Sequence, residues 1–219
     1  MNTTRTMAAR LRQLRLVPVI VIDDPMHAPA LGRALVGGGL PCAEVTFRTS
    51  GARDALARLI EECPEVLVGA GTVLTPAQVK DARSAGAKFV VAPGFNPAVV
   101  DCCLEYEMPV FPGIATPSEI EAALARGLSI LKFFPAEPLG GINYLKAIAA
   151  PYGAVEFMPT GGISIQNVGA YLSFPRVVAC GGSWMASAQW IAAGEFERIT
   201  AEVRRAVAAV QSINGVDGT

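Results

Sequence analysis

The chain has 219 residues, of which 52% are hydrophobic, with 18 basic and 19 acidic side chains. This length and hydrophobic content suffice for one large domain with a buried core. The even charge balance gives no electrostatic reason to expect a nucleic acid or a membrane surface as partner. The apolar run after the first 16 residues spans only about six residues, too few for a signal peptide or a membrane span.

Short apolar runs recur along the chain after a predicted N-terminal helix over residues 1–16. They are rich in valine and isoleucine and begin about every 20 to 26 residues, as expected for strand–helix repeats. The eight predicted strands are Val17–Ile22, Cys42–Thr46, Val66–Ala70, Phe89–Ala92, Val110–Pro112, Ile130–Phe133, Glu156–Thr160 and Val177–Gly181. Strands that are apolar on both faces are typical of a parallel sheet covered by helices.

The helices between these strands have clear start signals. A capping residue stands directly before a proline at Asp24-Pro25, Thr75-Pro76, Asn96-Pro97 and Thr116-Pro117. Eight strand–helix units at this spacing favour a (β/α)8 TIM barrel with an extra N-terminal helix over an open doubly wound sheet. No linker or low-complexity segment divides the chain, so we expect a single domain over residues 1–219.

Lys132 stands near the end of the apolar strand Ile130–Phe133, which is the end at which barrel enzymes place their active sites. Burying an ammonium group is costly, so such a lysine finds a partner or loses its proton, and a desolvated amine is a nucleophile. Lys80, Lys88 and Lys146 lie in helical stretches or at a strand entrance. A lysine whose stem packs while its amine reaches solvent is the alternative.

The strand Cys42–Thr46 and the residues after it alternate in polarity. Ala43, Val45 and Phe47 fall on one face, and Glu44, Thr46 and Arg48 fall on the other. Because the apolar face of a barrel strand meets the helices, the polar face points inward. We therefore expect Glu44 deep in the barrel near Lys132 and Arg48 near the mouth. An internal ion pair that only fills the barrel is the alternative.

Glycines mark the ends of several strands. Gly69 and Gly71 precede Thr72, where they would let a ligand approach the backbone. The glycine pairs 161–162 and 181–182 follow the seventh and eighth strands, where this fold commonly binds phosphate through backbone N–H groups. No lysine or arginine lies within these two segments, so we expect the phosphate to be held by backbone dipoles and hydroxyl groups.

Metal and thiol chemistry are disfavoured by composition. The single histidine excludes a zinc site built on a histidine cluster. The five cysteines form an odd count without a Cys-x-x-Cys pair, which is typical of reduced cytosolic thiols used as small apolar residues. We expect no metal and no cofactor.

Five motifs in chain order resemble the 2-keto-3-deoxy-6-phosphogluconate aldolase family, which also includes 4-hydroxy-2-oxoglutarate aldolase. They are Glu-Val-Thr-Phe-Arg-Thr (44–49), Gly-Ala-Gly-Thr-Val (69–73), Lys-Phe-Phe-Pro-Ala-Glu (132–137), Pro-Thr-Gly-Gly-Ile (159–163) and Gly-Gly-Ser-Trp (181–184). The resemblance runs from about Val17 past Trp184. Only the lead-in Pro41-Cys42-Ala43 departs from it, where a basic residue and larger aliphatics are common.

The resemblance implies a class I aldolase of the Entner–Doudoroff pathway, with Lys132 as Schiff-base lysine and Glu44 as general acid and base. It further implies substrate contacts from nine residues. Those for the pyruvate carboxylate are Arg48 and Thr72, the pocket walls are Pro93 and Phe134, and those at the phosphate are Thr160, Gly161, Gly162, Gly182 and Ser183. The resemblance also implies a cytoplasmic homotrimer.

Three alternatives remain open from the sequence. The first is the phosphogalactonate aldolase, which differs at one hydroxyl stereocentre of its substrate. The second is a phosphate-binding barrel that runs isomerase or synthase chemistry and needs no imine-forming lysine. The third is a non-catalytic phosphosugar-binding barrel, which would bind its ligand without turnover.

Overall fold

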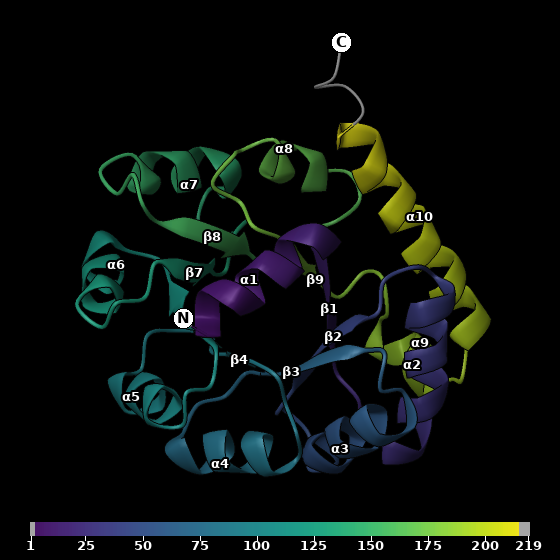
Figure 1. Ribbon diagram of the computed structural model, residues 1–219. Helices are drawn as coiled ribbons and strands as arrows, with labels where there is room; N and C mark the ends of the chain where they lie inside the picture. Colours follow the sequence, from purple (N-terminus) through teal and green to yellow (C-terminus); the bar gives the residue numbers. More distant parts are fainter. Residues whose placement is uncertain (1–2, 215–219) are drawn as a thin grey trace.

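The computed structural model describes residues 3–214, so the outermost residues of the predicted domain and N-terminal helix lie outside the described part. Strands and helices alternate around a barrel (Figure 1). The strands are β1 (Leu16–Ile20), β2 (Cys42–Thr46), β3 (Leu67–Gly71), β4 (Val90–Val91), β5 (Val110–Phe111), β6 (Gly113–Ile114), β7 (Ile130–Phe133), β8 (Glu156–Pro159) and β9 (Cys180–Gly182). The helices are α1 (Thr3–Leu14), η1 (Pro25–His27, a 3₁₀ helix), α2 (Ala28–Gly37), α3 (Ala52–Glu62), α4 (Pro76–Ser84), α5 (Pro97–Glu105), α6 (Pro117–Leu124), α7 (Gly141–Ala149), α8 (Val168–Leu172), α9 (Ala188–Ala192) and α10 (Phe196–Asn214).

The strands close into a parallel barrel. Six of them pair in the order β5-β4-β3-β2-β1-β9, and three pair in the order β6-β7-β8. Bridges between Phe157 and Val177 and between Thr160 and Gly181 join the second set to β9. On the other side the two sets meet at Pro112, where the predicted fifth strand ends. β5 precedes this proline and β6 follows it, because proline cannot donate to a ladder. The predicted (β/α)8 barrel is therefore confirmed.

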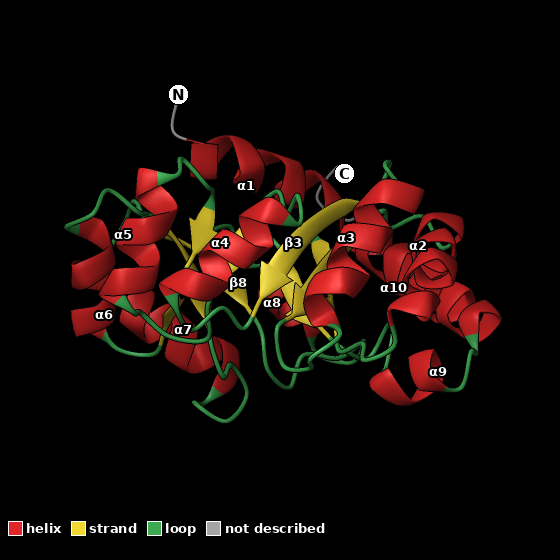
Figure 2. Ribbon diagram, turned by 90° about the horizontal axis from the view of Figure 1, so that it is seen from below, coloured by secondary structure: helices red, strands yellow, loops and turns green. Residues whose placement is uncertain are grey.

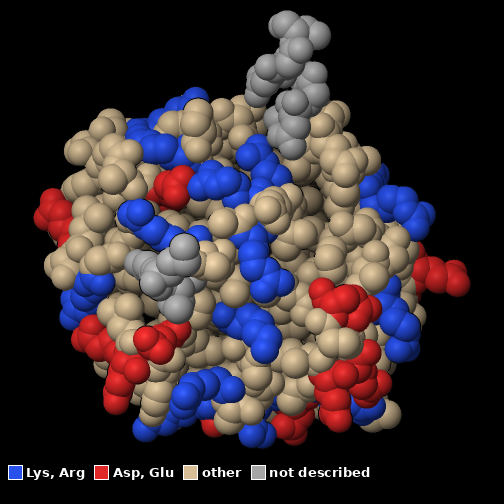
Figure 3. All heavy atoms as spheres, in the orientation of Figure 1, with Lys and Arg blue, Asp and Glu red and all other residues tan. Residues whose placement is uncertain are grey.

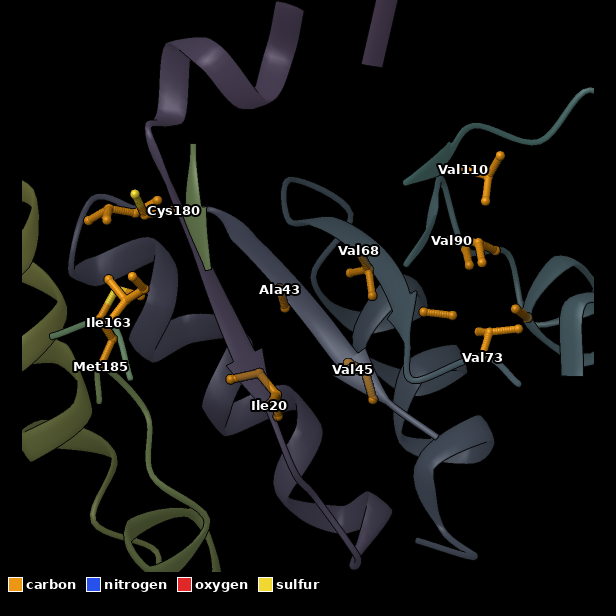
Figure 4. Packing of buried hydrophobic residues seen from close by; sticks show 14 of the residues in the cluster. Ile20, Ala43, Val45, Val68, Val73, Val90, Val110, Ile163, Cys180 and Met185 are labelled. Carbon is orange, nitrogen blue, oxygen red and sulfur yellow. The ribbon is translucent and has the colours of Figure 1, made fainter. Parts of the chain in front are cut away.

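The apolar core has two layers. The outer layer lies between the strands and the surrounding helices, where Ile20, Ala43, Val45 and Val68 project from three adjacent strands (Figure 4). The helices that cover this layer encircle the strands (Figure 1), and they flank the strands in side view (Figure 2). The inner layer fills the barrel with side chains that include Val17, Leu67, Phe89, Phe111 and Ile130.

Helix α1 closes the barrel at the amino ends of its strands. Its residues Met7, Ala8 and Leu11 are buried and belong to the inner core layer. In side view α1 lies at one end of the barrel and the strand-to-helix loops lie at the other (Figure 2). Lys and Arg side chains gather over and around α1, and Arg5 and Arg10 on this helix are exposed (Figure 3). The predicted N-terminal helix thus plugs the end of the barrel that is opposite the loops.

Most of the predicted helix starts are present, with one difference. The side chains of Thr75 and Asn96 accept hydrogen bonds from the backbone N–H groups of Gln78 and Ala98. Asp24 caps the 3₁₀ helix η1 instead of an α-helix, and α2 begins after it. Across residues 3–214, no helix combines the length and the apolar character that crossing a membrane would require.

Candidate active site

Lys132 and Glu44 meet inside the barrel. Lys132 on β7 and Glu44 on β2 are only 4% and 2% exposed, and Lys132 Nζ lies 3.3 Å from Glu44 Oε1. The other three lysines of the chain are exposed. The structure therefore places this pair where the alternation of strand β2 predicted it, in a region from which water is largely excluded.

Neighbouring strands leave room for Glu44. A Cβ atom on Gly71 would lie 2.3 Å from Glu44 Oε1, so only glycine fits beside this carboxylate. Gly69 likewise makes room for the ring of Phe89. The sequence predicts that these two glycines let a ligand approach the backbone, and in the structure the space that their side chains would need is occupied by Glu44 and Phe89. Thr46, the next inward residue, donates its hydroxyl to the backbone oxygen of Ile20 at 2.8 Å.

Two further predicted site residues lie close to Lys132. Its ammonium group is 5.1 Å from the centroid of the Phe134 ring. On the other side Gly113 of β6 pairs with Lys132, and a Cβ atom on Gly113 would lie 2.1 Å from the backbone oxygen of Pro93. Pro93 thus packs against the strand next to the lysine, which is consistent with a wall position.

A cavity of about 350 Å³ opens at the carboxyl ends of the strands. Its volume lies within the range typical of small-molecule sites. Seven of the predicted site residues line it: Arg48, Phe134, Thr160, Gly161, Gly162, Gly182 and Ser183. Because Phe134 contacts both this cavity and the ammonium of Lys132, the buried ion pair lies next to the cavity. Lys132, Glu44, Thr72 and Pro93 do not themselves line it.

Arg48 is a basic residue that shares the cavity with glycines of both pairs, although it lies outside both segments. It follows β2 in a turn, donates from Nε to Thr72 Oγ1 at 3.1 Å, and lines the same cavity as Gly161 and Gly162. Thr72 holds the left-handed φ of +54°, which is uncommon for a residue with a branched side chain. The sequence alone does not predict this shared cavity, because Arg48 and the glycine pairs lie far apart along the chain.

Glycine is required in the two glycine pairs for different structural reasons. Gly161 and Gly162 have φ values of +100° and +79°, which other residues adopt only with strain. Gly181 and Gly182 instead leave space for neighbours, since added Cβ atoms would lie 2.4 Å from Thr160 Oγ1 and 1.8 Å from the Trp184 ring. The first pair therefore forms a turn, and the second pair permits close packing at the mouth.

Sequence reasoning missed five residues that line the cavity: Val19, Val21, Ile163, Ser187 and Ala188. Val19 and Val21 share one face of an extended segment, so the alternation that located Glu44 could have located them too. Ser187 caps α9 by accepting a hydrogen bond from the N–H of Trp190 at 3.3 Å. A serine before a helix is a recognisable signal, but it indicates capping and not binding.

The thiols are poorly placed for nucleophilic chemistry. All five cysteines are buried and unpaired. Burial raises the pKa of both Cys42 and Cys103 to about 12, so their thiolate forms are scarce at neutral pH. In the described part of the chain, no three His, Cys, Asp or Glu side chains are grouped so that they could hold a metal ion.

A closed barrel that holds a lysine and a glutamate in contact, beside a cavity at the carboxyl ends of its strands, has the architecture of a lysine-dependent aldolase. The family model described as "Aldolase: KDPG and KHG aldolase" matches residues 7–202. The chain belongs to this family of carbon–carbon lyases.

Individual relatives agree with this assignment. The chain is 53% identical over 196 residues to the 2-dehydro-3-deoxy-phosphogluconate aldolase of Treponema pallidum, with 90% of this chain and 93% of the relative covered. It is 45% identical over 192 residues to the KHG/KDPG aldolase of Escherichia coli K12, with 88% and 90% covered. The structure of KDPG aldolase from Legionella pneumophila, with pyruvate captured as a covalent carbinolamine intermediate, matches with a TM-score of 0.88 and 39% identity. That match covers 92% of this chain and 98% of the other.

Proposed function

We propose that the protein cleaves 2-keto-3-deoxy-6-phosphogluconate into pyruvate and glyceraldehyde 3-phosphate, and that it also cleaves 4-hydroxy-2-oxoglutarate into pyruvate and glyoxylate. The observation that carries the proposal is the contact between buried Lys132 and buried Glu44 beside the cavity. The names of the relatives from Treponema pallidum and Escherichia coli support the two substrates. Lys132 is the Schiff-base lysine of this proposal, and Glu44 is its general acid and base.

The first chemical step is formation of an imine. Glu44 lies 3.3 Å from the amine and takes a proton from it, so that Lys132 can attack the C2 ketone of the substrate. The same carboxyl group returns a proton to the hydroxyl group of the carbinolamine, which leaves as water. The resulting iminium is an electron sink next to the bond that breaks, so this route requires no metal and no cofactor.

The second step is cleavage of the bond between C3 and C4. Glu44 accepts the proton of the C4 hydroxyl group as the electrons of the C3–C4 bond move into the iminium, which becomes an enamine. The aldehyde product leaves, the enamine is protonated at C3, and water releases pyruvate from Lys132. A single carboxyl group can serve every proton transfer because it is already in contact with the lysine.

The two ends of the substrate require different partners. The guanidinium of Arg48, oriented by Thr72, is suited to bind the planar carboxylate of the 2-oxo acid. Phe134 and Pro93 form walls around the reacting carbon atoms. The phosphate is assigned to the turn of Thr160, Gly161 and Gly162 and to Gly182 and Ser183, which line the same cavity.

The imine is tested by chemical trapping. The protein is incubated with pyruvate, reduced with borohydride and digested, and the modified peptide is identified by mass spectrometry. We expect a pyruvyl adduct on Lys132 only, since the other lysines are exposed and have no buried carboxylate beside them. A Lys132→Arg variant is the control and should give none. An adduct on Lys88 or Lys146, or no adduct in the unmodified protein, would sink the assignment.

Substrate assays decide between the remaining alternatives. Steady-state rates are compared for the phosphogluconate and phosphogalactonate epimers and for 4-hydroxy-2-oxoglutarate. We expect the highest kcat/KM for the phosphogluconate form. Higher activity on the galactonate epimer would favour that aldolase, and ligand binding without turnover of any of the three would favour a binding protein.

Assembly and location are further parts of the proposal. We propose a cytoplasmic homotrimer in which each chain acts as one barrel domain, as its resemblance to the family implies. Sedimentation equilibrium should then give a mass of three times the chain mass of 22.9 kDa. A mass that corresponds to one or two chains would refute the trimer.

A further inference from the structure

We propose that Glu137, held by Tyr171, is a positioning residue that fixes the Gly161-Gly162 turn and thereby selects for phosphorylated substrates. The inference rests on the proposed function and concerns a side chain that has no role in it so far. Glu137 does not line the cavity, but it packs against the turn that does.

The stem of Glu137 occupies the space that a side chain at position 162 would need. A Cβ atom on Gly162 would lie 2.6 Å from Glu137 Cβ and 2.7 Å from its Cγ. The backbone joins the same two segments, since the N–H of Glu137 donates to the oxygen of Gly161 at 3.0 Å. The turn is therefore pressed against Glu137 on one side while its backbone faces the cavity.

The carboxylate of Glu137 is held in turn by Tyr171. The hydroxyl of Tyr171 donates to Glu137 Oε1, and the tyrosine is only 1% exposed on α8. A Cβ atom on Gly141 would lie 3.0 Å from the same oxygen, which places the carboxylate beside the first turn of α7. A helix amino end stabilises negative charge. The Glu137 carboxylate therefore interacts with Tyr171 and the amino end of α7. These contacts reduce its repulsion of a phosphate bound at the turn.

The far side of the turn is fixed independently. Asn167 donates from Nδ2 to the oxygen of Gly162 at 3.0 Å and accepts from the N–H of Ser164 at 2.8 Å. Because both flanks are fixed, loss of the Glu137 contact should loosen the turn without releasing the whole loop. The expected defect is then confined to whatever binds the N–H groups of the turn.

The test compares the phosphorylated and unphosphorylated substrates in three variants. In Tyr171→Phe the hydroxyl is removed and the ring is kept, and in Glu137→Ala the stem is removed. For both variants we expect KM for 2-keto-3-deoxy-6-phosphogluconate to rise about 3- to 10-fold, with KM for 4-hydroxy-2-oxoglutarate within about twofold of wild type. Glu137→Gln keeps the stem and an acceptor oxygen, so its KM for the phosphorylated substrate should stay close to the wild-type value.

Inorganic phosphate provides a second measurement. With 4-hydroxy-2-oxoglutarate as substrate, phosphate should inhibit by occupying the turn, and its inhibition constant should rise in Tyr171→Phe by the same factor as KM does for the phosphorylated substrate. Tyr152→Phe is the matched control. It removes another tyrosine hydroxyl that donates to a glutamate, Glu121 at 2.9 Å, and it should change neither constant.

Equal effects on both substrates, or no effect in Glu137→Ala, would overturn the proposal. Loss of the fold in Tyr171→Phe would also overturn it, because the pair would then stabilise the barrel and not the turn. Failure of the proposed function has a different signature, since the unmodified protein would then form no pyruvyl adduct and cleave neither substrate.

Discussion

At the scale of single residues, the contact between Lys132 and Glu44 is better explained by reactivity than by stability. Two unit charges 3.3 Å apart attract by about 5 kcal/mol at an effective dielectric constant of 20. Removing two charges from water costs several kcal/mol for each ion, which offsets this attraction. Because the net stabilisation is small, an apolar pair would serve the fold as well. The small net stabilisation is in keeping with the catalytic roles proposed above for Lys132 and Glu44.

Replacement of Glu44 by glutamine tests this conclusion. The amide keeps the size of the side chain but cannot take a proton from the amine or the C4 hydroxyl group, so we expect turnover to fall by about 10²–10⁴-fold. The variant should remain folded by circular dichroism and still form some imine with pyruvate. Glu62→Gln, at an exposed glutamate that pairs with Arg58, is the control. A folded variant that keeps most of its turnover would favour a filling role for the ion pair.

At the scale of elements, the predicted position of a side chain agrees with the structure where the residue lies within a regular strand. Glu44 and Lys132 were located from apolar runs and side-chain alternation, which are properties of the sequence itself. Arg48 was placed at the mouth, but the cavity that it shares with Gly161 could not be predicted. It lies in a turn after β2, where alternation no longer applies, and the residues that share its cavity come from several separate segments of the chain.

The same distinction applies to the fold. The closed barrel followed from the spacing of apolar runs, which predicts eight strands where the described residues form nine. The break at Pro112 and the short β4 did not, because they depend on which neighbouring backbone groups are available for pairing. The role of Gly71 also could not be predicted, since a glycine in a strand indicates close approach without showing what approaches.

A Gly71→Ala variant tests whether β3 sets the position of Glu44. The added Cβ atom would lie 2.5 Å from Glu44 Cγ, so the carboxylate must move away from Lys132. We expect kcat to fall about tenfold or more, because a misplaced catalytic group loses much of its effect. Gly153→Ala is the control, since no atom lies within 4 Å of its Cβ position. Full activity of the Gly71→Ala enzyme would mean that Glu44 needs no fixed position.

At the scale of the whole molecule, the residues that stabilise the fold and the residues that line the cavity lie at opposite ends of the barrel. The inner core layer and α1 occupy the amino ends of the strands, and the cavity occupies the carboxyl ends. Substitutions at the plugged end should therefore change the free energy of unfolding and leave the reaction unchanged.

Leu11→Ala is the corresponding prediction. Leu11 is fully buried between α1 and the barrel, so its truncation should cost about 2–5 kcal/mol of stability. For a chain of this size the melting temperature should fall by roughly 4–20 °C in a calorimetric scan. The value of kcat at 25 °C should equal that of the wild type. Gln13→Ala, at an exposed position of the same helix, is the control. A loss of kcat in Leu11→Ala would show that the two ends are coupled.

The plug formed by α1 also determines how molecules travel through the enzyme. Met7, Ala8 and Leu11 pack into the amino-terminal end of the barrel and close it. Substrate and products therefore enter and leave through the opening at the carboxyl ends of the strands. In the proposed binding mode, pyruvate is attached to Lys132 at the inner end of this passage, and the aldehyde lies between it and solvent. The aldehyde must therefore depart before pyruvate, and in the synthetic direction pyruvate must arrive first.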